Sequence, residues 1–261
     1  MNILVCLKMV SRATYTDMLC ADDASDDRLS GGMIEINPAD AYALETSLKL
    51  KDRYGAYVTV LSMSPMLAEP MLRSALAMGA DEAVLVCDRI FAGSDTIATA
   101  KTLSAALKAL PRQDMIFCGS KAIDSETGHI GAQLAALNEL RYMGDVLAVN
   151  ELRDGRLCVK HAGKHGAEEY SLVLPAVFSI INGTGMIRSP TIFGLRSSAK
   201  REIRIMTGDT LHLTAEQAGK NASGTETVRI DRLSFAHRHG AYTDDVHDGA
   251  AGLAEMLECA K

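Results

Sequence analysis

The sequence predicts an α/β fold: a parallel sheet flanked by helices, then a short β-rich continuation and an extended C-terminal arm. Two observations support this prediction. Apolar runs of strand length alternate with amphipathic segments of helix length over the first two-thirds of the chain, a pattern typical of parallel sheets covered on both faces. After about residue 144, strand-like runs follow one another with few helical signals between them.

The strands of the first part are expected at residues 2–7, 57–63, 83–87 and 115–118, with a short extended piece at 33–36. An Asp-rich loop holding Asp22, Asp23, Asp26 and Asp27 precedes that extended piece. A helix is expected to begin at Asn37-Pro38, because Asn is favoured at the N-cap and Pro at the first helical position, and to end at Gly55. Further helices are expected from Pro70 to Gly79, from Gly93 to Leu110 and over 128–138.

The second part contains strand-like runs at residues 146–149, 156–159, 169–173 and 176–181, with a hairpin turn at Asp154-Gly155. Residues 204–261 hold too few large apolar residues to build a second core. We therefore expect them to pack on another surface and to end in a short helix around Leu253, Met256 and Leu257.

Composition excludes several function classes. A formal net charge of −6, without a Lys/Arg run, argues against a nucleic-acid surface. No apolar stretch reaches the roughly 20 residues that a membrane span needs, so no direct membrane insertion is expected. Six scattered cysteines without a C-x-x-C motif (Cys6, Cys20, Cys87, Cys118, Cys158, Cys259), and an N-terminus without a signal-peptide pattern, predict a reduced, cytoplasmic protein.

The most informative motif runs from Cys118 to Gly131. It follows the apolar run Met115–Phe117 and leads into a helical pattern, and a strand that delivers a glycine- and hydroxyl-rich loop onto a helix N-terminus is typical of phosphate binding. Asp124 and Glu126 would not attract a phosphate, so binding is expected from backbone N–H groups and the hydroxyls of Ser125 and Thr127. The alternative interpretation is an ordinary capped helix start.

No metal site or catalytic constellation is expected. His161, His165, His237, His239 and His247 have no Cys or carboxylate at ligand spacing, so they are interpreted as solvated. No Ser/His/Asp or Cys/His arrangement indicates a hydrolase or ligase. Ser30-Gly31-Gly32 and Gly183-Thr184-Gly185 depart from known phosphate-loop patterns, and the second is interpreted as a flexible bend.

Motifs in the same order along the chain resemble the beta subunit of electron transfer flavoproteins. They are the helix start Asn37-Pro38-Ala39-Asp40, the helix end Ala75 to Asp81, the loop Cys118 to Gly131 and the strand entry Leu174-Pro175-Ala176-Val177. The resemblance covers most of the chain. It implies an adenine-nucleotide-binding, Rossmann-like domain at residues 1–186, followed by a partner-docking segment and C-terminal arm at 187–261.

The resemblance also implies a function. The chain would pair with an electron transfer flavoprotein alpha subunit and pass electrons between a dehydrogenase or NADH and an acceptor, with electron bifurcation as an open possibility. The external partner would be an acyl-CoA dehydrogenase or another flavin reductase or dehydrogenase. NADH oxidation would be expected only if the protein bifurcates electrons, and only together with the alpha subunit. The alternative is a stand-alone adenine-nucleotide-binding sensor of the same sheet architecture.

Cofactor-binding residues are carried over from the family's motifs: Cys6, Lys8, Asn37, Asp40, Met63, Gly119, Ser120, Lys121, Ala122, Ile123, Asp124, Ser125, Glu126, Thr127, Gly128 and Ile130. A second segment, with Ser94, Asp95, Thr96 and Thr99, is similar to that of the branch that holds FAD rather than AMP, so FAD is the expected nucleotide and AMP the alternative. Arg188, Pro190 and Ile192 match the docking segment, although Ser197, Ser198 and Ala199 thin its lysine-rich stretch.

Overall fold

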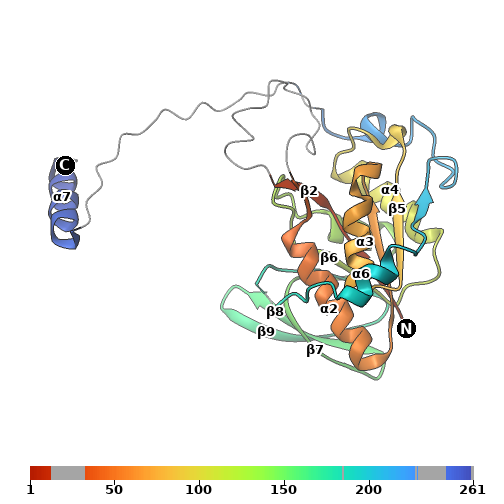
Figure 1. The fold of residues 1–261 in the computed structure, drawn as a ribbon, viewed down its shortest axis with the longest axis horizontal. Coiled ribbons are helices and arrows are strands. Elements are labelled where there is room, and N and C mark those ends of the chain that lie inside the picture. Colours follow the sequence, from red (N-terminus) through yellow and green to blue (C-terminus); the bar gives the residue numbers. More distant parts are fainter. Residues whose placement is uncertain (13–32, 184, 227, 229–244, 260–261) are drawn as a thin grey trace. The chain divides into compact units, whose positions relative to one another are not determined.

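The computed structural model describes residues 1–12, 33–183, 185–226, 228 and 245–259 (Figure 1). Among these residues, one sheet has nine strands in the order β11-β5-β4-β1-β6-β10-β7-β8-β9. Its strands are β1 (Asn2–Cys6), β4 (Tyr57–Met63), β5 (Glu82–Val86), β6 (Met115–Gly119), β7 (Arg141–Arg153), β8 (Arg156–Gly163), β9 (Gly166–Val173), β10 (Ala176–Ile180) and β11 (Arg204–Met206). A separate antiparallel pair consists of β2 (Met9–Arg12) and β3 (Met33–Ile36).

The helices alternate with the strands as the sequence predicts. They are α2 (Pro38–Tyr54), α3 (Glu69–Met78), α4 (Thr96–Lys108), α5 (Ile130–Leu137), α6 (Ile192–Ser198) and α7 (Val246–Cys259), with the short 3-10 helices η1 (Met66–Ala68), η2 (Arg89–Phe91) and η3 (Gly219–Ala222). β1 pairs in parallel with both β4 and β6. The predicted α/β class with a mostly parallel sheet is therefore confirmed.

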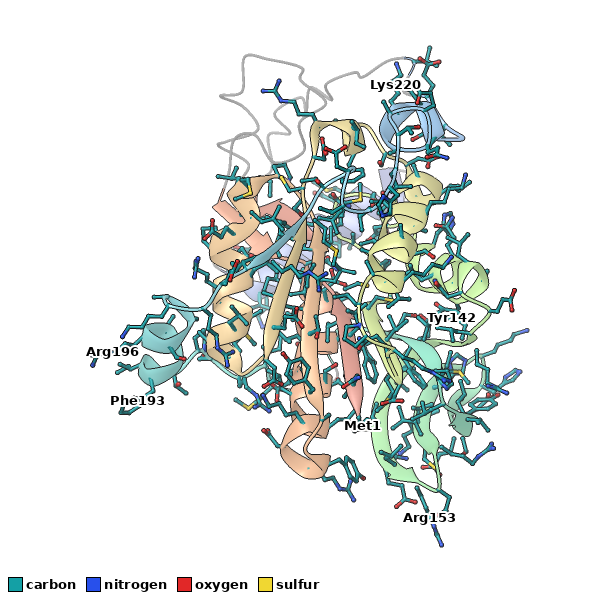
Figure 2. All side chains as sticks on the ribbon, turned by 90° about the vertical axis from the view of Figure 1, so that its right-hand side faces the viewer. Met1, Tyr142, Arg153, Phe193, Arg196 and Lys220 are labelled. Atoms are coloured by element: carbon teal, nitrogen blue, oxygen red, sulfur yellow. The ribbon has the colours of Figure 1, made fainter. Side chains whose placement is uncertain are left out.

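Alternate side chains of the central strand enter two different apolar layers. Ile3 and Val5 of β1 pack in the layer that α2 and α3 cover, whereas Leu4 and Cys6 pack in the layer under α4 and α5. Figure 2 shows helices on both sides of the sheet. Because a strand buried on both faces has no polar side, β1 is apolar throughout its buried part, as parallel strands generally are.

The β-rich continuation, β7 to β10, belongs to the same nine-stranded sheet as the first part of the chain. The hairpin predicted at Asp154-Gly155 is confirmed, since it connects β7 to β8. However, β10 does not continue this meander. It lies between β6 and β7 and is parallel to both, which places the end of β10 beside the end of β6, where Ser120 N–H donates to the Ile180 carbonyl at 2.8 Å.

The first part of the expected arm packs on its own sheet. β11 adds in parallel to the edge strand β5, and Met206, Leu211 and Ala218 are buried in the layer that holds Leu103. The expectation that residues 204–261 pack on another surface is therefore wrong for this part. A few apolar residues suffice here because they extend a core that already exists.

Residues 227–261 form a separate unit, in which the structure describes α7. The predicted C-terminal helix is confirmed, and it leaves Leu253, Met256 and Leu257 between 61% and 67% exposed at helical i, i+3, i+4 spacing. In the described part of the chain, no helix has the length and apolar character of a membrane span. The Asp-rich loop, Cys20, Ser30–Gly32, Thr184, His237 and His239 lie outside the described residues.

The division into two units leads to a truncation prediction. Among the described residues, none of the buried core lies beyond Ala218. We expect a chain ending at Glu226 to keep the fold, with a midpoint of thermal unfolding within about 4 °C of the full-length chain, the shift that roughly 1 kcal/mol produces at this size. Calorimetry of both chains measures this. Loss of the cooperative transition in the truncated chain would contradict the division.

Candidate functional site

The carboxyl ends of the central strands meet at one edge of the sheet. The chain leaves β1 to form β4 on one side and later returns to form β6 on the other, so this edge holds the point at which the strand order reverses. Open α/β sheets bind ligands at such a point. Cys6 ends β1, Met63 ends β4 and Gly119 ends β6, so three of the expected cofactor-binding residues lie at this edge.

Asp40 joins the ends of two strands to the first turn of α2. Its Oδ2 accepts a hydrogen bond from Lys8 N–H, and its Oδ1 accepts one from Gly119 N–H, both at 2.7 Å. Burial raises the pKa of Asp40 to about 6, although these two hydrogen bonds act in the opposite direction. Gly119 is required for this approach, because a Cβ there would lie 2.5 Å from Asp40 Oδ1.

Asn37 fixes the loop from Gly119 to Ile130, hereafter the phosphate loop. Its Oδ1 accepts from Ile123 N–H at 3.1 Å, and its Nδ2 donates to the Lys121 carbonyl at 3.0 Å. Asn37 is the N-cap residue of α2 as expected, but its side chain makes no capping bond to the helix. The buried amide instead forms hydrogen bonds with two main-chain groups of a loop more than eighty residues away in sequence.

The acidic side chains of the phosphate loop are paired with lysines. Lys8 Nζ lies 2.6 Å from Asp124 Oδ1 and 3.5 Å from Ser125 Oγ, and Lys121 Nζ lies 3.3 Å from Glu126 Oε2. These contacts offset the negative charge that the sequence places on the loop. Within the loop, Glu126 N–H donates to the Ala122 carbonyl at 2.8 Å, which closes a compact turn.

α5 begins where the phosphate loop ends. Its first residue is Ile130, and His129 before it makes no side-chain capping bond. α5 thus offers first-turn N–H groups that no side chain of the N-cap residue satisfies, and these groups, with the helix dipole, favour an anion. Ser125 and Thr127 precede this helix by a few residues, and both are exposed. Hydroxyl groups that donate to the same anion would need to be exposed.

The thiols beneath the site are buried and neutral. Burial raises the pKa of Cys6 to about 12 and holds that of Cys118 well above its ordinary value. Cys118 Sγ contacts the Phe178 carbonyl at 3.6 Å. Because a nucleophile or metal ligand must be a thiolate, these cysteines act here as small core residues.

The second predicted segment, with Ser94, Asp95, Thr96 and Thr99, lies at the start of α4. Asp95 already caps the N-terminus of this helix. Asp95 accepts from Ala98 N–H at 2.9 Å and from Gly224 N–H at 2.7 Å, and Ser94 Oγ donates to the Phe91 carbonyl. Thr96 Oγ1 accepts from Gln133 Nε2 of α5 at 3.3 Å, which joins the two helix starts. Thr99 is half-buried in the first turn of α4.

The three expected docking residues have different environments. Ile192 starts α6 and is 84% exposed. Pro190 is half-buried. The Arg188 side chain is bonded within the chain, to Glu45 and Asp52 of α2. The Glu45 carboxylate raises the pKa of Arg188 above its ordinary value.

Sequence reasoning missed the roles of Gln133 and Glu45. Gln133 was part of an apolar helical pattern and nothing in its spacing indicated a bond to Thr96. Glu45 stands inside the Asn37–Asp40 helix motif, but a carboxylate on a helix face gives no signal of its partner. In the described part of the chain, no group of His, Cys, Asp or Glu side chains forms a metal site, and His161 Nδ1 contacts the Gly144 carbonyl instead.

Comparisons with known proteins agree on one family. The electron transfer flavoprotein domain model matches residues 31–203. The electron transfer flavoprotein subunit beta of Thermoanaerobacterium thermosaccharolyticum is 35% identical over 259 residues, 98% of each chain. The caffeyl-CoA reductase-Etf complex subunit CarD of Acetobacterium woodii is 34% identical over 88% of this chain and 87% of its own. The acryloyl-CoA reductase electron transfer subunit gamma of Anaerotignum propionicum is 42% identical over 61% of this chain and 64% of its own.

The buried carboxylate leads to a prediction about pH. Asp40 has a pKa of about 6 in the folded chain against an ordinary value of 3.8, so the unfolded chain releases this proton first. The contribution of Asp40 to the free energy of unfolding should therefore fall by about 3 kcal/mol as the pH rises from about 4 to above 6. Asp40→Asn does not titrate, so urea unfolding of both proteins across this range isolates the effect.

The control for this experiment is Asp154→Asn, which removes an exposed carboxylate. The stability of that variant should follow the wild-type pH dependence. A constant difference between wild type and Asp40→Asn from pH 4 to pH 7 would show that Asp40 titrates normally.

Proposed function

The chain belongs to the electron transfer flavoprotein family as a beta-type subunit, and on this premise we propose that its phosphate loop binds an adenine nucleotide. Paired with an alpha subunit, the chain would take part in passing electrons between a dehydrogenase or NADH and an acceptor. The observation that carries the proposal is the α5 N-terminus without a side-chain cap, at the end of a loop that Asp40 and Asn37 hold in place.

The residues present fit a phosphate group. Backbone N–H groups of α5 and the hydroxyls of Ser125 and Thr127 are donors of the kind that phosphate oxygens accept. Lys8 pairs with Asp124 and Lys121 pairs with Glu126, so the two carboxylates of the loop are neutralised and do not repel a phosphate. A flavin in this place would supply reversible electron transfer, whereas the protein supplies binding, orientation and electrostatic tuning.

We further propose that the nucleotide is FAD, with AMP as the alternative that the experiment below decides. The bond between Thr96 Oγ1 and Gln133 Nε2 supports FAD, because it brings the start of α4 beside the start of α5. Thr96 accepts in that bond, so its own hydroxyl hydrogen can be donated to a second phosphate. A pyrophosphate could then use the first-turn N–H groups of α5 together with the Thr96 hydroxyl, which one phosphate does not need.

Docking to an electron-transfer partner is proposed for the segment that leads into α6. The partner would be an acyl-CoA dehydrogenase or another flavin dehydrogenase or reductase. Ile192 and Phe193 are 84% and 86% exposed, and Phe193 projects outward from α6 (Figure 2). Exposed adjacent apolar side chains are suited to insertion into an apolar pocket of another protein. The exposed face of α7 is proposed to contact the alpha subunit.

The nucleotide proposal predicts a change in flavin count. Thr96→Val keeps the shape of the side chain and removes the donor, which should cost roughly 1.5–3 kcal/mol, about one to two decades in affinity. In the heterodimer, two flavins should fall to one. Absorbance of the purified heterodimer measures the ratio, and Thr96→Ser, which keeps the hydroxyl, should retain both. A wild-type ratio of one that does not change would mean AMP.

The docking proposal predicts a partner-specific defect. Ile192→Ala should leave the nucleotide content unchanged and raise the KM for the electron-transfer partner about tenfold, the effect of losing roughly 1.4 kcal/mol of contact energy. Steady-state transfer between the heterodimer and its partner measures this. Val228→Ala, a truncation at a side chain that is 93% exposed, should have no effect. An unchanged KM for Ile192→Ala would refute the docking assignment.

A further inference from the structure

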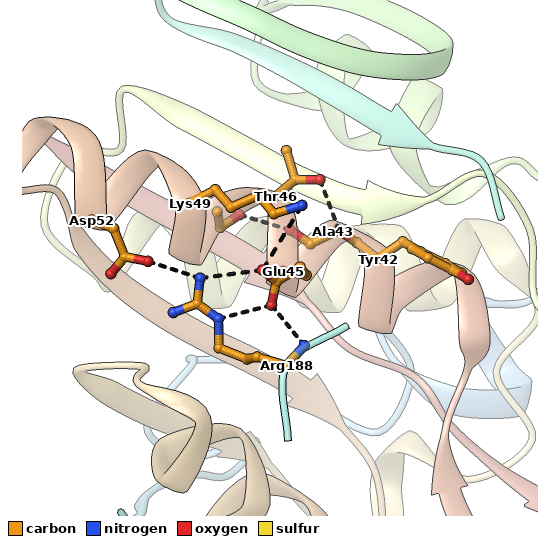
Figure 3. Close-up of polar contacts among 8 residues, drawn as sticks. Tyr42, Ala43, Glu45, Thr46, Lys49, Asp52 and Arg188 are labelled. Carbon is orange, nitrogen blue, oxygen red and sulfur yellow. Dashed lines mark hydrogen bonds and ion pairs between the residues drawn. The ribbon is translucent and has the colours of Figure 1, made fainter. Parts of the chain in front are cut away.

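Arg188 and Glu45 form an ion pair that ties the chain before α6 to the middle of α2. Arg188 Nε lies 2.8 Å from Glu45 Oε2, and Arg188 Nη2 lies 3.2 Å from Glu45 Oε1 (Figure 3). The main-chain N–H of Arg188 also donates to Glu45 Oε2 at 3.1 Å. Asp52, about two helical turns farther along α2, accepts from Arg188 Nη2 at 2.8 Å. We call this group the arginine clamp.

Side-chain exposure rises along the arginine clamp from Glu45 through Arg188 to Asp52. The Glu45 side chain is 7% exposed, the Arg188 side chain 29% and the Asp52 side chain 60%. A buried carboxylate is costly unless it is paired and hydrogen-bonded. Among the described residues, Lys49 is the other cation near Glu45, but its Nζ is 3.9 Å away. Arg188 therefore provides the close, two-pronged pairing that Glu45 needs.

The far end of the same segment is held against α3. Arg73 of α3 donates to the carbonyls of Ser198 and Arg201, and Arg201 donates to the Ala80 carbonyl at 2.7 Å. Gly194 allows the close approach, because a Cβ there would lie 2.1 Å from the Ala77 carbonyl oxygen. Residues 188–201 are thus fixed at both ends, with Ile192 and Phe193 exposed between them.

One helix carries both the clamp and the support of the phosphate loop. Asp40 and Glu45 are five residues apart on α2, which corresponds to about 7.5 Å along a helix axis. A segment held on this helix keeps a set position relative to the nucleotide loop. Holding an apolar contact in place before binding also removes the entropy cost of ordering it during binding.

We propose that Arg188 and Glu45 are positioning residues, which present Ile192 and Phe193 to the electron-transfer partner in one fixed orientation relative to the phosphate loop. This inference rests on the proposed docking function. It assigns the Arg188 guanidinium to contacts within this subunit, with Glu45 and Asp52, which hold α6 in position. A contact with the partner would be left to the apolar side chains and not to this arginine.

The test uses the heterodimer with Glu45→Gln, Arg188→Lys and Arg188→Gln. We expect Glu45→Gln and Arg188→Gln to raise the KM for the electron-transfer partner about tenfold, with kcat at saturating partner and nucleotide content unchanged. Arg188→Lys keeps the charge but not the fork and should fall between these variants and wild type. The control is Arg153→Gln, which removes an arginine from an exposed pair with Asp154 and should change nothing.

Hydrogen exchange gives a readout that does not depend on the partner. The amides of Leu195 and Ala199 are bonded within α6, to the Thr191 and Leu195 carbonyls. They should exchange about tenfold faster in Glu45→Gln and Arg188→Gln, whereas amides of α4 should not change. Unchanged exchange in α6 would overturn the inference.

A combined variant separates this inference from the docking assignment. If the clamp acts by presenting Ile192 and Phe193, then Glu45→Gln added to Ile192→Ala and Phe193→Ala should raise the KM no further than those two truncations alone. Fully additive effects on KM would overturn the inference. If Ile192→Ala has no effect, the docking function itself fails and the inference fails with it. If Ile192→Ala raises KM but the clamp variants do not, the inference alone fails.

Discussion

Asp40 accepts hydrogen bonds from the main chain after β1 and from the main chain at the end of β6, each at 2.7 Å. Its own place in the first turn of α2 makes it the junction of three elements. The rest of the site depends on this junction, because the phosphate loop leaves β6 at Gly119 and Asn37 holds the next part of the same loop. The cost is a buried carboxylate, whose raised pKa reflects incomplete compensation for lost solvation.

α2 connects the phosphate loop to the segment that carries the exposed Ile192 and Phe193. Its first turn organises the phosphate loop, and its middle holds the arginine clamp. A helix is a stiff element, so two features on one helix keep their separation better than two features joined by loops. This arrangement accounts for three buried polar or charged residues: Asn37 before the helix, Asp40 in its first turn and Glu45 near its middle. Each is satisfied by main-chain or arginine partners from distant segments.

The charge of the phosphate loop shows the limit of composition as evidence. Asp124 and Glu126 argue in the sequence against anion binding, yet Lys8 and Lys121 lie within ion-pair distance of them. The same limit applies to Asn37, whose residue type favours a helix cap but whose amide serves the loop. At both places the residue type indicates a local role, whereas the side chain bonds to a partner that only the tertiary structure brings near.

The sequence by itself determined the α/β class, the order of strands and helices, the hairpin at Asp154-Gly155 and the loop between β6 and α5, because periodicity and turn chemistry act over a few neighbouring residues. Only the tertiary structure decided that β10 enters the parallel sheet, that β11 extends its edge and that Arg188 pairs with Glu45. These partners are far apart in the chain, 143 residues for Arg188 and Glu45. Such pairings follow from how buried groups are satisfied after the sheet has formed, which no local pattern records.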